Sequence, residues 1–187
     1  MMARRVRRLA VVVILLLVAS AVALVLITRP QLEDRRDDVD RAWTPLRAPL
    51  AARYEQLAAV NAELAAAGAG ERSVARELGT TLTRWDRLRR SSDDDADADA
   101  EVDTADRLEG LATRLQAVVL SSDRLRGVES LNQAIAAFQG TGQPLQPAAT
   151  AYNDAAREYE DERSSFLRRP AADLFGYDSR PQLLLGT

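Results

Sequence analysis

An acidic stretch in the middle of the chain has the ligand spacing of a calcium-binding loop. Residues 91–106 read SSDDDADADAEVDTAD. If Asp95 takes the first position of an EF-hand loop, further acids fall at positions 3, 5, 9 and 12. Carboxylate oxygens are the ligands that Ca²⁺ prefers. The candidate metal ligands are therefore Asp95, Asp97, Asp99, Asp103 and Asp106.

Two positions of this stretch depart from the EF-hand pattern. Ala100 stands where the loop needs a glycine for its sharp turn, and Asp106 is too short to replace the usual bidentate Glu. The alternating aspartates and alanines are typical of a solvated, disordered segment. We therefore predict an acidic loop over residues 91–103 that binds no metal or cofactor. A calcium-responsive module on residues 95–106 is the alternative function.

The chain lacks the side chains that most enzymes use. It contains no Cys, no His and no Lys. This excludes thiol and imidazole nucleophiles, Schiff-base lysines, the P-loop lysine and zinc sites made of His and Cys. A hydrolase that uses two carboxylates is the second alternative, but no spacing places two of them in one pocket. We predict that the protein is not an enzyme and has no catalytic residues.

Charge is unevenly distributed along the chain. There are 25 basic and 28 acidic residues, but the first 29 residues hold five arginines and no acid. The remainder is therefore acidic, whereas nucleic-acid binding needs a basic surface that contacts phosphates. We predict that the protein does not bind nucleic acid.

Residues 9–28, LAVVVILLLVASAVALVLIT, are apolar and carry no charge. A helix of about this length crosses the hydrocarbon core of a membrane. The alternative is a cleaved signal peptide with a small-residue site at 19–21 or 21–23. Because the apolar run continues past both sites, we expect an uncleaved single-pass anchor. Four arginines in the tail 1–8 favour a cytoplasmic N-terminus and an extracytoplasmic domain in the cell membrane.

After a predicted juxtamembrane linker at 29–38, apolar residues recur every three or four positions. This is the spacing of helices packed in a bundle or coiled coil. Pro45 and Pro49 predict a kink or restart, with Thr44 as the N-cap. Gly68 and Gly70 end the helix. The row is Val39, Trp43, Leu46, Leu50, Arg53, Leu57, Val60 and Leu64, interrupted only by Arg53.

Similar apolar strips follow over residues 74–88, 108–118, 131–138 and 152–166. Asp103 or Thr104 caps the third helix, and Arg168-Arg169-Pro170 closes the last. No segment alternates with the period of a strand. We predict an all-α fold, an antiparallel up-and-down bundle of about four helices over residues 39–170, with a tail at 171–187. Its predicted aromatic core residues are Trp43, Trp85, Tyr152 and Tyr159.

The two ends of this region carry recognisable motifs. Near the start stand Ala42-Trp43 and Arg53-Tyr54-Glu55, and near the end Tyr152-Asn153, Tyr159, Phe166 and Leu174-Phe175-Gly176-Tyr177. In this order they resemble the LemA family. The chain departs from the family pattern at residues 57–61, at Glu160 and at Leu167. The motif positions carried over, as structural positions, are Trp43, Arg53, Tyr54, Tyr152, Asn153, Tyr159, Phe175 and Gly176.

The resemblance implies a bacterial, membrane-anchored helix bundle but no activity. We therefore expect a non-enzymatic protein of the bacterial cell envelope that acts through protein–protein interaction. Its expected partners are the membrane, through residues 9–28, and envelope or membrane proteins, including a second copy of itself.

Overall fold

The fold is given by a computed structural model that describes residues 2–70, 72–91, 95–165 and 169–185. For residues 2–28, 95–97, 170 and 171 the description covers the backbone alone. The described chain is helical and contains no strand, which confirms the all-α prediction. It divides into two compact units, residues 1–38 with 157–179 and residues 39–156 with 180–187.

The first helix, α1, runs without interruption from Met2 to Ala66. The predicted linker at 29–38 is wrong, because these residues are part of α1. No glycine interrupts them, Leu32 is fully buried, and Arg29 pairs with Glu33 one turn away at 2.9 Å. Every member of the predicted row from Val39 to Leu64 is buried, including Arg53.

The predicted restart at Pro45 is also wrong. Residues 44–50 are helical, and the Thr44 hydroxyl donates to the Asp40 carbonyl at 3.0 Å instead of capping a new helix. Both prolines lie on the exposed side of α1, where the backbone groups that they leave unpaired face solvent. The buried row continues beneath them through Leu46 and Leu50.

The end of α1 is where the glycines predicted it. Gly68 has a φ of 72°, and its N–H donates to the Ala65 carbonyl at 2.9 Å. The Ala69 N–H donates to Leu64 at 3.0 Å. These two bonds form a Schellman motif, which ends a helix at a residue in the left-handed conformation.

Helix α2 spans Ser73–Ser91 and helix α3 spans Asp95–Leu120. The predicted acidic loop at 91–103 is therefore wrong: Ser91 ends α2, and α3 begins at Asp95. Only residues 92–94 lie outside the description between them. Ala98 and Val102 are buried against the bundle, and aspartates are favourable in the first turns of a helix because they face its positive end.

The rest of the chain forms short helices before one longer one. They are α4 (Asp123–Arg126), α5 (Glu129–Gly140), a 3₁₀ turn η1 (Gln143–Leu145) and α6 (Gln146–Ser164). The predicted close at Arg168-Arg169-Pro170 is wrong, because α6 ends at Ser164 and α7 (Arg169–Phe175) begins at Arg169. Arg168 lies outside the described residues. The predicted boundary at 170 thus falls inside α7.

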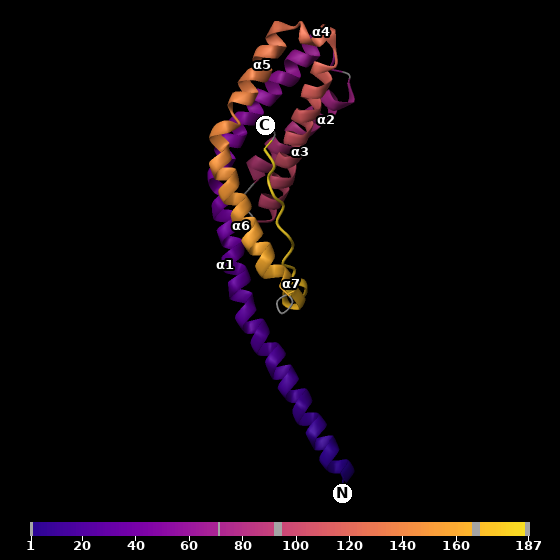
Figure 1. Cartoon of the computed structure of the whole chain (residues 1–187), viewed down its shortest axis with the longest axis vertical. Helices are drawn as coiled ribbons and strands as arrows, with labels where there is room; N and C mark the ends of the chain where they lie inside the picture. The colour runs from indigo at the N-terminus through magenta and orange to yellow at the C-terminus, as the bar shows by residue number, and fades with distance from the viewer. Residues whose placement is uncertain (1, 71, 92–94, 166–168, 186–187) are drawn as a thin grey trace. The chain divides into compact units, whose positions relative to one another are not determined.

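In the unit formed by residues 39–156 and 180–187, contacts define how the helices run. Trp43 contacts Glu101 and Arg53 contacts Glu109, so α1 and α3 are parallel. Helix α2 runs antiparallel to α3 beside it (Figure 1). Helices α5 and α6 run one after the other along α1, antiparallel to it. This direction follows from the contacts Glu63–Ser130, Arg53–Phe138 and Trp43–Tyr152.

The other unit joins the N-terminal part of α1 to the end of α6 and to α7. Arg35 pairs with Glu158 at 2.7 Å, and the Tyr177 hydroxyl donates to Glu33 at 3.1 Å. Three predicted motif positions lie here. Tyr159 is buried and donates to the Asp178 carbonyl at 2.9 Å, Phe175 lies beneath the Arg29 guanidinium, and Gly176 has a φ of 71° that ends α7.

The predicted transmembrane anchor, residues 9–28, falls in the part of α1 whose side chains lie outside the description. Among the residues that were described, none of the helices has the length and apolar character that a membrane crossing requires. The anchor and the orientation derived from it stay predictions.

Replacing Pro45 or Pro49 with Ala is predicted to raise the free energy of unfolding by about 1–3 kcal/mol. Proline inside a helix costs about 3 kcal/mol relative to Ala, and neither ring contributes to the core. Urea unfolding of the full chain in detergent measures the change. The matched control Ala48→Gly, between the two prolines, lowers stability by about 1 kcal/mol. A neutral or destabilising Pro45→Ala would instead favour a helix that starts at Pro45, where proline is well tolerated.

Candidate functional site

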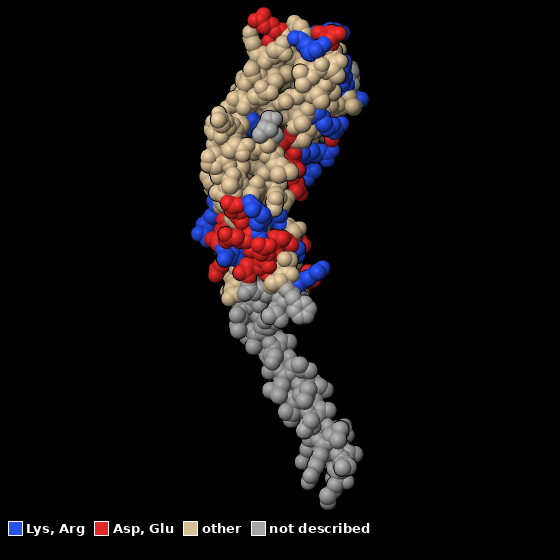
Figure 2. Space-filling model, in the orientation of Figure 1, with Lys and Arg blue, Asp and Glu red and all other residues tan. Residues whose placement is uncertain are grey.

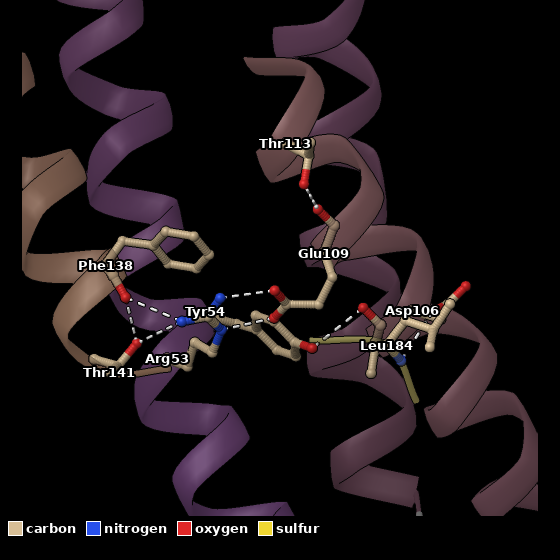
Figure 3. A network of polar contacts seen from close by, with 9 residues as sticks. Arg53, Tyr54, Asp106, Glu109, Thr113, Phe138, Thr141 and Leu184 are labelled. Carbon is tan, nitrogen blue, oxygen red and sulfur yellow. Dashed lines mark hydrogen bonds and ion pairs between the residues drawn. The ribbon is translucent and has the colours of Figure 1, made fainter. Parts of the chain in front are cut away.

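A buried ion pair lies at the centre of the unit formed by residues 39–156 and 180–187. Arg53 on α1 and Glu109 on α3 are 1% and 2% exposed. The Arg53 Nε and Nη2 atoms donate to the two carboxylate oxygens of Glu109, each at 2.7 Å (Figure 3). This bidentate geometry is the strongest that an arginine and a carboxylate can form.

The remaining side of the Arg53 guanidinium contacts the C-terminal end of α5. Its Nη1 donates to the Phe138 carbonyl and to the Thr141 hydroxyl, both at 3.0 Å, and the guanidinium carbon lies 3.9 Å from the centre of the Phe138 ring. A Cβ at Gly142 would come within 3.1 Å of this Nη1. The charge is therefore paired, hydrogen-bonded and stacked, as a buried arginine requires.

A second buried carboxylate lies two helical turns before Glu109. Glu101 is fully buried, and its Oε2 accepts hydrogen bonds from the Trp43 indole at 2.7 Å and from Arg47 Nε at 2.8 Å. Its other oxygen, Oε1, has no hydrogen-bond partner within the described part of the chain. Glu101 and Glu109 thus connect α3 to α1 at two levels.

Tyr54 fills the space between these levels. Its hydroxyl donates to the Ala105 carbonyl at 3.2 Å, and its ring meets Trp85 of α2 edge-on at 4.9 Å. Burial raises the pKa of Tyr54 well above its ordinary value, and the nearby Glu109 charge adds to the effect. Tyr54 therefore stays neutral and is part of the core.

The extended segment after α7 packs onto the bundle through residues 180–185, which we call the strap. The Arg180 side chain is 2% exposed and lies between Asp40 of α1 and Asp99 of α3, with Nη2 donating to Asp40 at 2.8 Å. Burial alone would lower the pKa of Arg180, but the two carboxylates raise it overall. Arg180 therefore keeps its charge in this position.

The predicted motif residues Tyr152 and Asn153 hold the strap. The Tyr152 hydroxyl donates to the Pro181 carbonyl at 2.8 Å. The Asn153 amide bonds the backbone of Leu183 twice, as donor to its carbonyl and as acceptor from its N–H, both at 2.8 Å. Tyr152 also packs against Trp43, with ring centres 5.3 Å apart. These motif positions thus have a structural role.

The three candidate calcium ligands whose side chains are described, Asp99, Asp103 and Asp106, do not converge. The side chains of Asp95 and Asp97 lie outside the description, Asp99 binds Arg180, and Asp106 accepts from the Leu184 N–H at 3.3 Å. Asp103 lines a different surface, a cavity between α2 and α3. Within the residues described, no three acids form a group that could hold a metal ion. The helical backbone from Asp95 onward also lacks the turn that an EF-hand needs.

That cavity, about 450 Å³, bears on the hydrolase alternative because two carboxylates, Glu77 and Asp103, line it. Glu77 accepts from Arg107 at 2.8 Å and from Arg114 at 3.3 Å. The hydrogen bond from Arg107 lowers the pKa of Glu77 below its ordinary value. A glycosidase needs one carboxylic acid with a raised pKa, so Glu77 is unsuited to that role.

Sequence reasoning identified one side of this network and missed the other. Arg53 stood out because it interrupts an apolar row. Glu101 was missed because the start of α3 was predicted at Asp103 or Thr104. Glu109 lay inside the predicted helix but was not distinguished from the other acids of the chain. Extending that helix to Asp95 places Glu101 on the same buried row as Ala98, Ala105, Leu108 and Ala112, where a carboxylate signals a buried partner.

Comparison with known proteins finds no family model, no curated protein and no solved structure that matches the chain. The resemblance to the LemA family stays a prediction.

The Arg53–Glu109 pair is predicted to show strong energetic coupling. Arg53→Met or Glu109→Leu alone leaves a buried charge without its partner and lowers the free energy of unfolding by about 3–5 kcal/mol. The double variant replaces both charges with apolar groups and costs clearly less than the sum of the two. Urea unfolding of the four proteins measures the cycle.

The control is the exposed pair Arg107–Glu77, in which Arg107 is 60% exposed. Arg107→Met is expected to change stability by about 0–1 kcal/mol. Strictly additive costs at Arg53 and Glu109 would contradict a direct buried pair.

Proposed function

We propose that the chain is a non-enzymatic, membrane-anchored helical-bundle protein of the bacterial cell envelope, a divergent member of the LemA family that acts by binding other proteins. Its partners are membrane or envelope proteins, including a second copy of itself. The observation that carries this proposal is an uncharged surface on a chain that is otherwise rich in charge.

Residues 130–153 contain no Asp, Glu, Arg or Lys, although charged residues make up 28% of the chain. They form most of α5, η1 and the first part of α6, and this face is almost free of charge in Figure 2. Depletion of charge distinguishes the centre of protein interfaces from the rest of a surface. Exposed residues of this face include Gln133, Ala136, Ala137, Gln139, Gln143, Gln146, Thr150 and Ala151.

The buried charges support the same proposal. Arg53, Glu109 and Arg180 are each paired inside the bundle. Side chains that hold helices together in this way stabilise a scaffold. The surfaces of such a scaffold remain free to bind.

Membrane anchoring rests on residues 9–28, which carry no charge. The unbroken backbone of α1 connects this segment to the bundle. Arginines at positions 4, 5, 7 and 8 favour the cytoplasm for the N-terminus. The bundle then lies on the extracytoplasmic side, next to envelope proteins.

Single-cysteine crosslinking tests this proposal directly, because the natural chain has no cysteine. Ala136→Cys, on the uncharged face, is labelled in intact cells with a photo-crosslinking maleimide that cannot cross the cytoplasmic membrane. We expect labelling without lysis, followed on illumination by crosslinks to membrane or envelope proteins or to a second copy.

The matched control is Ala117→Cys, an exposed alanine on α3 away from this face. It should be labelled equally but give about tenfold fewer crosslinks, a difference equivalent to about 1.4 kcal/mol of binding. Labelling only after lysis would contradict the orientation, and equal crosslinking from both positions would contradict the role of the face.

A further inference from the structure

The strap, residues 180–185, is bound to the helices in the way that peptide-binding sites hold an extended ligand. We call its contact residues Asp40, Asp99, Asp106, Tyr152 and Asn153 the strap site. In Figure 1 the non-helical segment after α7 runs beside α3 and α6. Three of the five residues contact the backbone of the strap, so these bonds need an extended chain and depend little on its side chains.

Two strap side chains supply selectivity. Arg180 enters between the carboxylates of Asp40 and Asp99, and Leu183, three residues later, is 1% exposed. Gln182 and Leu184 face solvent, Leu184 being 68% exposed. The strap site therefore selects an extended segment in which a leucine follows an arginine by three residues.

We propose that the strap site is a peptide-binding site whose second occupant is the strap of another copy of this chain. All five site residues belong to α1, α3 and α6, and all strap contacts come from one short extended run. A strap from a second copy can therefore make every contact that the resident strap makes. Exchange of an identical segment between copies is a low-cost route to a dimer.

The segment before the strap allows this exchange. Asp178 and Ser179 are exposed and non-helical, so a change of path there breaks no helix. The six strap residues pair with both carboxylates, bond the Asn153 amide and bury Leu183 at the same time. Two strap-site residues, Tyr152 and Asn153, fall within residues 130–153, but neither is among the exposed residues of the uncharged face. Exchange of the strap can therefore hold or fail independently of binding at that face.

Crosslinking between two differently sized versions of the full chain tests the exchange. One version carries Asp106→Cys, and the other, with a larger tag, carries Leu184→Cys; these positions adjoin in the structure. After mixing, a short bis-maleimide should give a dimer of mixed size, linked between positions 106 and 184. A single chain with both cysteines should crosslink internally, which verifies the geometry of the site.

The control pairs Leu184→Cys with Ala117→Cys, about 16 Å farther along α3. We expect about tenfold more mixed dimer with the cysteine at 106 than with this control. Arg180→Glu with Leu183→Asp in the donor chain should remove the excess. A synthetic peptide of residues 178–187 at about 1 mM, comparable to the effective concentration of a tethered segment, should reduce it by about half, and the same peptide with Arg180→Glu should not.

Several results would overturn the proposal. Mixed dimer no more abundant than in the control would show that the strap stays in its own chain. Mixed dimer that survives the Arg180→Glu and Leu183→Asp changes would show contact through another surface. Failure of the internal crosslink would show that the strap does not occupy the site at all.

Discussion

Two buried carboxylates on one helix, Glu101 and Glu109, constrain the whole bundle. Each must find donors on α1, because a buried charge without a partner would cost several kcal/mol. Glu109 takes both donors of the Arg53 fork, and Glu101 takes the Trp43 indole and Arg47. A shift of α3 by one turn would break both sets at once. The polar contacts thus determine how α1 and α3 are aligned along their axes. An apolar row alone would allow one helix to shift along the other.

The same constraint extends to the segments packed around this pair of helices. Arg53 also bonds the end of α5, so the α1–α3 alignment fixes where α5 stops and α6 begins. Asp99, half a turn before Glu101, binds Arg180 and so positions the strap. From Asp95 onward, the acidic stretch that resembles a calcium loop is the first part of a structural helix. Its carboxylates at Asp99, Glu101 and Asp106 bond other segments of the chain. The uncharged surface on α5 and α6 is the one that we propose for partners.

Sequence periodicity predicted the buried faces well, because burial of an apolar row dominates helix packing. The row of α1 and the end of that helix at Gly68 both hold in the structure. The predictions of a helix restart at Pro45 and of a loop in the acidic run were wrong. At both places tertiary packing outweighed a weak local propensity to interrupt a helix. The strap could not be predicted, because Asn153 recognises the backbone of Leu183 and a backbone leaves no pattern in sequence.

Helix α3 begins near Asp95 and is held there by Glu101. Native-state hydrogen exchange of the full chain measures this most directly, because backbone amides in a packed helix exchange only when it opens. We expect the amides of residues 99–109 to exchange at least about 1,000-fold more slowly than in an unstructured peptide, and to the same degree along the segment. Exchange at the unstructured rate over residues 99–103, with protection only from Leu108 onward, would show that these residues form an acidic loop instead.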